Sequence, residues 1–231
     1  MPPETTIEVP EAAACPTCHK TAALCVCAGI EPIDNRVFVL LLQHPQEQDR
    51  DLGTARLAAA YFRNAAFKVG LSWPNLANAL GRPVADPKRW GVLYLGPAVL
   101  PPEAEGREIT LLDRKGALDP DQDAALSELD GIVLLDGTWS QAKALWWRNA
   151  WLLKLRRIVL TPPAPSRYGN LRKEPRRESV STLEAAALAM SRLERRPDLQ
   201  TRMIASFEAL LQRYRAGKKT SKTPAVDRRR R

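Results

Sequence analysis

The apolar positions of the chain form short runs separated by longer amphipathic stretches. Val37–Leu42 is a continuous apolar run bounded by polar residues, as in a strand buried on both faces. Similar runs occur at Val92–Leu95, Ile132–Leu135 and Ile158–Leu160, and apolar residues alternate from Phe67 to Trp73 as in a half-buried strand. This pattern predicts a sheet assembled from short strands.

Helical periodicity occupies much of the sequence between these runs. Ser181-Thr-Leu-Glu184 fits the capping box, in which a Ser hydroxyl and a Glu carboxylate bond the free amides at a helix start. Strands that alternate with helices favour an α/β domain, with a mostly parallel sheet and helices on both faces. Helices are expected over Thr54–Asn64, Asp121–Leu129, Ser140–Leu155, Ser181–Arg195 and Leu199–Tyr214.

Composition places the chain among globular proteins. Of its 231 residues 45% are apolar and 26% charged, which excludes wholesale disorder, a collagen-like repeat and a disulfide-stapled mini-protein. The longest apolar run is far shorter than the 18 or so residues of a membrane span. No signal-peptide pattern opens the chain, so we expect a cytoplasmic protein that does not enter a membrane.

Four regions follow from these features. We expect a flexible leader at 1–14, a four-cysteine segment at 15–30, an α/β domain at 31–214 and a basic, disordered tail at 215–231.

The net charge of +9 is concentrated in two segments. Arg215–Arg231 holds eight bases and one acid, and Arg156–Arg177 holds seven bases and one acid. Clustered Lys and Arg favour a polyanionic partner because they release counterions from phosphates. A solvated disordered end explains the tail equally well. The internal cluster favours a function, because Pro, Tyr168 and Gly169 interrupt any regular surface helix there.

All four cysteines fall in one short segment, with the spacing Cys15-x2-Cys18-x6-Cys25-x-Cys27. Four thiolates can surround one tetrahedral zinc ion, and a loop clamped in this way needs no core of its own. The sequence therefore predicts a small structural zinc knuckle. His19 could replace one thiol, and a redox or metal-free role for the cysteines stays open.

Polar residues follow several predicted strands. In parallel sheets, ligands bind outside the carboxyl ends of the strands. Gln43-His44-Pro45 ends the first strand, Leu95-Gly96 another and Asp136-Gly137-Thr138 a third. Asp136 or Thr138 could instead simply cap the following helix. Four tryptophans follow this motif, and at least two of them are expected to be core side chains. They are Trp139, Trp146, Trp147 and Trp151.

Taken together, these strings resemble the DTW-domain family over roughly Cys15 to Arg213. Two positions depart from the family pattern: Leu95 stands where many members have Pro, and Gly53 where many have Ser or Asn. The motifs occur in the family's order: Cys15-x2-Cys18 with Cys25-x-Cys27, Gln43-His44-Pro45, Thr54-Ala55-Arg56, Leu93-Tyr94-x-Gly96, Asp136-Gly-Thr-Trp139-x-Gln141-Ala142, Leu171-Arg172-Lys173-x-Pro175 and Ser181-Thr-Leu-Glu184-Ala185.

The resemblance implies a tRNA-uridine aminocarboxypropyltransferase. Such an enzyme transfers the 3-amino-3-carboxypropyl group of S-adenosylmethionine to N3 of a tRNA uridine and releases methylthioadenosine. The resemblance also implies a fold related to the knotted SPOUT class of RNA methyltransferases. Family members act on the variable loop in bacteria and on the D-loop elsewhere. Because the chain shows no eukaryote-like extension, the variable loop (nucleotide position 47) is the expected target. The expected partner is tRNA, and no obligatory protein partner is evident.

The chemistry assigns roles to the strand-end residues. Asp136 is the candidate catalytic residue, as a base for the uracil N3 proton or as a partner of the donor's ammonium group; His44 is the alternative base. A cation from Arg56 or Arg172 would keep such a carboxylate ionised. Contacts to the donor are expected from Leu95, Gly96, Asp136, Gly137, Thr138, Trp139, Leu160 and Thr182, and contacts to tRNA from His44, Arg56, Arg172, Lys173, Arg176 and Arg177.

Two alternative functions are compatible with the sequence. A SPOUT-like RNA methyltransferase would use the same donor in a similar fold. A non-catalytic zinc-containing RNA-binding protein would equally use the basic segments and the cysteines, but would leave the strand-end carboxylate unexplained. A nucleotide hydrolase is disfavoured because the chain has no Gly-x4-Gly-Lys-Ser/Thr loop.

Overall fold

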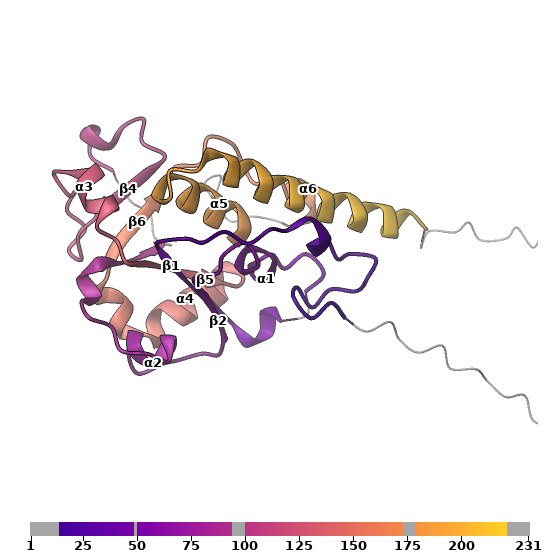
Figure 1. Cartoon of the computed structure of the whole chain (residues 1–231), viewed down its shortest axis with the longest axis horizontal. Helices are drawn as coiled ribbons and strands as arrows, with labels where there is room; N and C mark the ends of the chain where they lie inside the picture. Colours follow the sequence, from indigo (N-terminus) through magenta and orange to yellow (C-terminus); the bar gives the residue numbers. More distant parts are fainter. Residues whose placement is uncertain (1–13, 49, 94–99, 173–178, 221–231) are drawn as a thin grey trace, which may run out of the picture.

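A six-stranded sheet forms the centre of the molecule. The computed structural model describes residues 14–48, 50–93, 100–172 and 179–220. The strand order is β2-β1-β5-β3-β6-β4, and every neighbouring pair is parallel except β4 with β6 (Figure 1). The strands are β1 (Phe38–Gln43), β2 (Ala65–Val69), β3 (Trp90–Leu93), β4 (Ile109–Leu112), β5 (Gly131–Asp136) and β6 (Arg156–Leu160).

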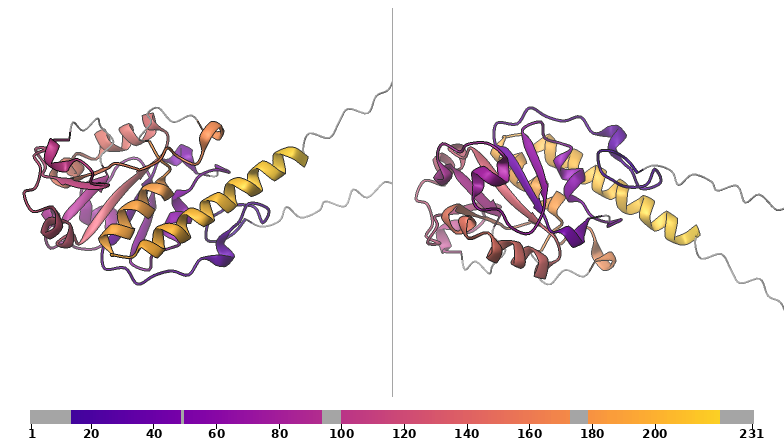
Figure 2. Two further views of the ribbon diagram at one scale, coloured as in Figure 1. Left: turned by 90° about the horizontal axis from the view of Figure 1, so that it is seen from above. Right: turned by 90° about the horizontal axis from the view of Figure 1, so that it is seen from below.

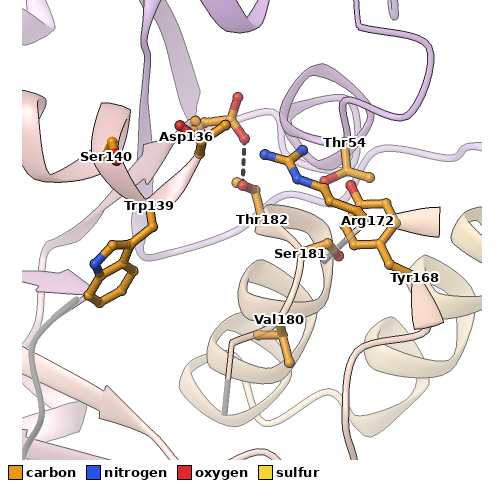
Figure 3. A pocket seen from close by; sticks show the side chains of 11 residues that line it. Thr54, Asp136, Trp139, Ser140, Tyr168, Arg172, Val180, Ser181 and Thr182 are labelled. Carbon is orange, nitrogen blue, oxygen red and sulfur yellow. Dashed lines mark hydrogen bonds between the residues drawn. The ribbon is translucent and has the colours of Figure 1, made fainter. Parts of the chain in front are cut away.

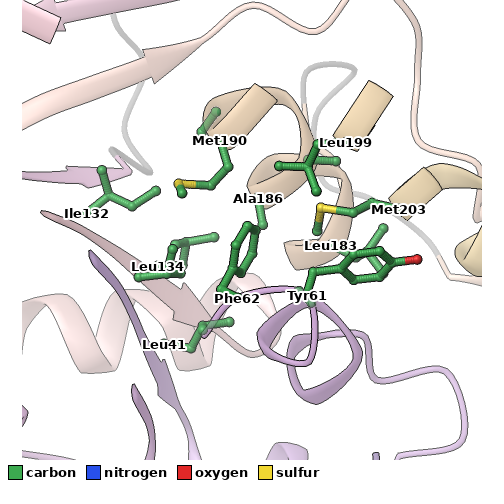
Figure 4. Close-up of a cluster of buried hydrophobic side chains, with 14 of the residues drawn as sticks. Leu41, Tyr61, Phe62, Ile132, Leu134, Leu183, Ala186, Met190, Leu199 and Met203 are labelled. Carbon is green, nitrogen blue, oxygen red and sulfur yellow. The ribbon is translucent and has the colours of Figure 1, made fainter. Parts of the chain in front are cut away.

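Helices cover both faces of the sheet, as the sequence predicts (Figure 2). Side chains alternate along β1, so Val39 and Leu41 face one core while Leu40 and Leu42 face the other. The first core packs against α1 (Ala55–Ala59), α3 (Gln122–Ser127), α5 (Thr182–Leu193) and α6 (Pro197–Thr220), and part of it is shown in Figure 4. The second packs against α2 (Leu76–Leu80) and α4 (Trp139–Arg148).

Short 3-10 helices complete the described elements. They are η1 (Cys27–Gly29), η2 (Pro45–Glu47), η3 (Pro87–Arg89), η4 (Pro102–Ala104), η5 (Ala150–Lys154) and η6 (Gly169–Leu171). A membrane-crossing helix is absent from the described part of the chain, because no helix there is both long and apolar enough.

Gly131 is required by the pairing of the three central strands. Phe38, Gly131 and Trp90 lie side by side in register on β1, β5 and β3. The rings of Phe38 and Trp90 meet across the glycine, with their centroids 5.8 Å apart. A Cβ on Gly131 would lie 2.5 Å from two atoms of the Trp90 ring. The small residue therefore makes room for an aromatic contact that joins the outer two strands of this trio.

Several elements differ from the sequence expectation. The pattern missed α2 and the edge strand β4, and the helix expected over Thr54–Asn64 is the short α1. The strand expected from Phe67 to Trp73 ends at Val69. At the C-terminal end, α6 extends to Thr220, past the boundary expected at Tyr214; residues 221–231 of the predicted tail lie outside the described residues.

The helix expected over Ser140–Leu155 is divided at Asn149. The Asn149 side chain is fully buried and bonds the Leu145 carbonyl, the Leu71 carbonyl and the Trp73 amide, so it ends α4 and fastens the 71–73 segment to it. Trp151 is buried and Trp146 packs against the same core, which confirms that at least two of the four tryptophans are core side chains.

We predict that Gly131→Ala destabilises the fold by about 1–3 kcal/mol, because the added methyl group forces the Trp90 ring out of its packed position. Gly29→Ala is the matched control, since a Cβ there meets nothing within 4 Å. Urea unfolding of the three proteins gives the comparison. Equal free energies of unfolding for both variants would show that the sheet accommodates the added methyl group without loss of stability.

Candidate functional site

The Asp136 carboxylate is the centre of the candidate site. Asp136 is the last residue of β5, lies beside Gln43 at the end of β1, and is only 5% exposed. Its Oδ2 accepts a hydrogen bond of 2.8 Å from Gln43 Nε2, and its Oδ1 accepts one of 2.5 Å from Thr182 Oγ1 at the start of α5. A carboxylate oxygen accepts more than one hydrogen bond, so each can still receive a ligand proton.

A cavity of about 520 Å³ opens beside this carboxylate (Figure 3). Its volume lies within the usual range for small-molecule sites. Four separate chain segments contribute to its wall: the start of α1, the turn from β5 into α4, the loop after β6 and the start of α5. The lining residues are Thr54, Asp136, Gly137, Thr138, Trp139, Ser140, Tyr168, Arg172, Val180, Ser181 and Thr182.

Arg172 provides a cation in the same cavity. Its Nη1 donates a 2.8 Å hydrogen bond to Glu47 Oε1, and the Glu47 side chain is only 3% exposed. Figure 3 shows the Arg172 guanidinium pointing toward the Asp136–Thr182 pair. A fixed anion and a fixed cation in one cavity match a ligand that carries both an ammonium and a carboxylate group.

Tyr168 forms the wall behind Arg172. Its hydroxyl donates a 2.6 Å hydrogen bond to the Leu52 carbonyl, and its ring packs edge-on against Phe207 of α6, with centroids 4.9 Å apart. The Arg172 guanidinium lies 5.7 Å from the centre of this ring. Burial raises the pKa of Tyr168, so the phenol stays neutral and serves as a rigid support.

Glu184 fixes the start of α5. It completes the capping box that the sequence predicts, accepting from the Ser181 amide while the Ser181 hydroxyl accepts from the Glu184 amide. Its carboxylate also accepts from the Ser166 hydroxyl and the Arg167 amide. Glu184 therefore joins the loop before Tyr168 to α5 and acts as a structural support of the cavity wall.

The turn between β5 and α4 needs a glycine. Gly137 has a φ of 155°, and a Cβ there would lie 2.7 Å from Gln141 Cβ. Thr138 and Gln141 then form a second capping box. Thr138, not Asp136, is thus the cap of α4, which leaves the Asp136 carboxylate for the cavity.

The structure brings together six of the predicted site residues. They line one cavity and come from three segments of the chain: Asp136, Gly137, Thr138, Trp139, Arg172 and Thr182. Five further predicted residues lie outside the described residues: Leu95, Gly96, Lys173, Arg176 and Arg177.

Three other predicted residues do not line this cavity. His44 caps η2, where its Nδ1 accepts from the Gln46 amide. The guanidinium of Arg56 lies 4.5 Å from the centre of the Phe67 ring. The amide after Leu160, expected to contact the donor, instead bonds the Glu108 carbonyl 2.9 Å away. That amide is occupied because the unpredicted strand β4 pairs with β6.

Sequence reasoning missed four contributors to the site. The sequence marks Gln43 only as part of a polar strand end, and it predicts no site role for Glu47, Thr54 or Tyr168. The available signal was the position of Gln43, one residue beyond an apolar strand and followed by Pro45. Nothing local marks Glu47, because its partner Arg172 is distant in sequence.

A second, smaller cavity of about 220 Å³ is lined in part by Gln43 and Glu47. Arg56 and Lys20 line it, and Gln43 Oε1 is buried without a hydrogen-bond partner among the described residues. The Lys20 ammonium donates to the Arg50 and Asp51 carbonyls, and burial lowers the pKa of Lys20. Lys20 thereby joins the cysteine segment to the loop that precedes α1.

The four cysteine Sγ atoms lie within 4.8 Å of one another. Tetrahedral zinc with bonds of about 2.3 Å requires sulfur atoms about 3.8 Å apart, so the cluster can hold such an ion. Exposed His19 is not part of this group. Backbone amides of Cys18 and Thr17 lower the pKa of Cys15 to about 6, while burial raises the pKa values of Cys18 and Cys27. Amides directed at a sulfur favour its thiolate form, which is the form that binds metal.

The described arginines of the internal basic segment make contacts within the protein. Arg156 pairs with Glu128, Arg157 donates to the Arg114 carbonyl, and Arg167 pairs with Glu208 and Glu184. Their charges are therefore partly used to hold the fold together.

Comparison with known proteins identifies the family. A model described as the DTW domain matches residues 12–215, so the chain belongs to the DTW-domain family. Relatives named tRNA-uridine aminocarboxypropyltransferase 2 include those of Mus musculus (28% identical over 200 residues) and Drosophila melanogaster (29% over 209 residues). The matches cover 85% of this chain, 61% of the mouse protein and 72% of the fly protein. The chain thus spans less than two thirds of the mouse relative. No solved structure matches significantly.

We predict one bound metal ion per chain, held by the four thiolates. Cys15→Ser should lower the metal content of the purified protein, whereas His19→Ala should leave it unchanged, because His19 is not part of the sulfur cluster. Elemental analysis of the three proteins measures this directly. Full metal content in Cys15→Ser would contradict a site that uses all four thiolates.

Glu47 should make the stability of the fold depend on pH. Burial raises its pKa above the ordinary 4.5, against the opposing effect of Arg172. The folded protein then holds this proton more tightly than the unfolded chain, so the contribution of Glu47 to stability falls as the pH rises above 4.5.

Glu47→Gln removes this titration. We expect its Tm relative to the unaltered protein to rise between about pH 4 and pH 7, measured by thermal unfolding. Exposed Thr201→Ala, which removes no ionisable group, serves as the control and should show no such trend. A fall of relative Tm over the same range would mean that the Arg172 ion pair outweighs the cost of burying the carboxylate.

Proposed function

We propose that the protein is a tRNA-uridine aminocarboxypropyltransferase. Its group donor is S-adenosylmethionine, its acceptor is N3 of a tRNA uridine, and its second product is methylthioadenosine. Support comes from membership of the DTW-domain family and from the names of the mouse and fly relatives. The observation that carries the proposal is the Asp136 carboxylate, held by Gln43 and Thr182 in a cavity that also contains Arg172.

The reaction depends on which carbon of the donor faces the acceptor. A sulfonium carries three carbon substituents, and attack at any of them expels a neutral thioether. Aminocarboxypropyl transfer requires the methionine γ-carbon to be presented, so the amino-acid portion must be held in one orientation. Asp136 can bind its ammonium group and Arg172 its carboxylate, because the two side chains line one cavity with opposite charges.

The bond changes balance without a further reactant. A bond forms between uracil N3 and the γ-carbon, and the bond from that carbon to sulfur breaks, with its electron pair remaining on sulfur. The N3 proton must leave, and a carboxylate within reach of N3 can accept it. Among the described residues that line the cavity, Asp136 carries the one carboxylate. It can act as this acceptor or as the partner of the ammonium group.

Three finer features belong to the same proposal. The cysteine cluster holds zinc, which supplies structural rigidity through Lys20 and the 50–51 carbonyls. The fold is related to the knotted SPOUT class, which the path of the chain in a crystal structure tests. The target uridine lies in the variable loop, which mapping of modified tRNA fragments tests.

Product mass separates the proposal from its nearest rival. An RNA methyltransferase with the same donor would add a methyl group, which is far lighter than an aminocarboxypropyl group. Incubation of purified protein with S-adenosylmethionine and unmodified tRNA, followed by nucleoside mass spectrometry, distinguishes the two. Absence of donor binding in calorimetry would instead favour a non-catalytic RNA-binding protein.

Asp136→Ala should lower the rate of transfer by about a hundredfold to ten-thousandfold, the usual range for loss of a group that transfers a proton or orients a reactant. tRNA retention on a filter should remain nearly unchanged, because phosphate contacts dominate RNA affinity. Thr201→Ala, at an exposed position of α6, is the control. Transfer at the unaltered rate in Asp136→Ala would remove this residue from the mechanism.

A further inference from the structure

The outward face of α4 carries an exposed aromatic side chain beside the cavity. Ser140, Lys143 and Trp147 recur at spacings of three and four residues, so they lie along one side of the helix. Ser140 lines the cavity, and Lys143 is exposed. With a rise of about 1.5 Å per residue, Trp147 is about 10 Å from Ser140 along the helix axis. The stripe therefore begins at the cavity rim and ends at a tryptophan.

Trp147 is far more exposed than a large apolar side chain usually is. Its exposed fraction is 72%, whereas the neighbouring Trp146 packs against the core behind α4. Ala142 and Leu145 are the buried residues of this helix, so Trp147 is not needed to attach α4 to the sheet. A large ring held on a rigid helix and open to solvent is suited to stack against a flat partner.

The segments that contain α2 and α4 carry charge of one sign. Residues 64–85 and 139–155 contain five bases and no acid. These segments include α2 and α4, which cover the same sheet face. They touch at the end of α4, where the Ser72 hydroxyl donates to the Arg148 carbonyl. Acid-free basic segments around an exposed ring favour a polyanion that carries unpaired bases.

We propose that the outer face of α4 binds single-stranded RNA next to the modified uridine, with an unpaired base stacked on Trp147. Lys143 and Lys154, both exposed, neutralise phosphates on either side of it. The proposal rests on the proposed function, because it takes the cavity at Ser140 as the place where the uridine reacts. Loops of tRNA supply unpaired bases, and RNA-binding proteins read such bases by aromatic stacking.

A second copy of the chain is the competing occupant of this surface. Leu71 and Leu153 are also partly exposed, at 37% and 42%, and the 71–73 segment is fastened to the end of α4. A two-fold interface here would place one acid-free segment against its own copy. Like charges facing each other oppose such an interface, whereas phosphates relieve the same repulsion.

Binding of labelled tRNA, measured by fluorescence anisotropy, tests the proposal. Trp147→Ala should weaken tRNA binding about tenfold, because stacking on one aromatic ring is lost, while Trp147→Phe should keep most of the affinity. Leu153→Ala is the matched control, as it removes an exposed apolar side chain nearby that cannot stack, and it should change little. A blunt-ended RNA duplex, which has no unpaired base, should bind Trp147→Ala and the unaltered protein equally.

A charge variant gives an independent measurement. Lys143→Ala should reduce the slope of log affinity against log salt by about 0.7 to 0.9, the value of one phosphate contact. Thermal unfolding of each variant verifies the fold. The proposal fails if Trp147→Ala binds tRNA as tightly as the unaltered protein, or if it loses affinity equally for the blunt-ended duplex. It also fails if the chain sediments as a dimer that Trp147→Ala dissociates.

The two proposals fail in different ways. If the unaltered protein forms the aminocarboxypropyl product while Trp147→Ala binds tRNA normally, the stacking surface is wrong and the function stands. If no product forms but Trp147→Ala binds tRNA more weakly, the surface is supported and the proposed reaction falls.

Discussion

The site depends on one buried carboxylate that is held from two sides. Asp136 is placed at the end of β5, and a buried charge is tolerated only when hydrogen bonds replace the water it has lost. Gln43 supplies one of these bonds and Thr182 the other. The parallel register sets Gln43 directly beside Asp136, and the capping box at Ser181 fixes the start of α5 beside both. The cavity wall is arranged around this point.

A second buried contact, between Glu47 and Arg172, gives the cavity its opposite charge. Removing Glu47 from water raises the pKa of its carboxyl, and Arg172 partly offsets that cost. In return, the guanidinium is held at one position instead of moving with the loop that carries it. Groups that are ordered before a ligand binds lose less entropy on binding, so this pair holds a preordered cation in the cavity.

The cysteine segment is connected to the same region through Lys20. Its ammonium bonds two carbonyls of the loop before α1, and Arg213 of α6 donates to the Cys25 carbonyl on the other side. A segment with no core of its own is thereby fastened both to the loop that leads to Thr54 and to the long C-terminal helix. The cysteine segment therefore contacts the loop that leads into the cavity wall at Thr54.

Local patterns in the sequence determined the β1, β3, β5 and β6 strands, the capping box at Ser181 and the clustering of the cysteines. They also placed Asp136 at a strand end, because apolar periodicity and caps are properties of neighbouring residues. Tertiary structure alone decided that Gln43 and Thr182 bind Asp136, that Glu47 pairs with Arg172, and that β4 occupies the amide after Leu160. These contacts join residues far apart in the chain, and their formation depends on sheet order and helix placement, which no local pattern encodes.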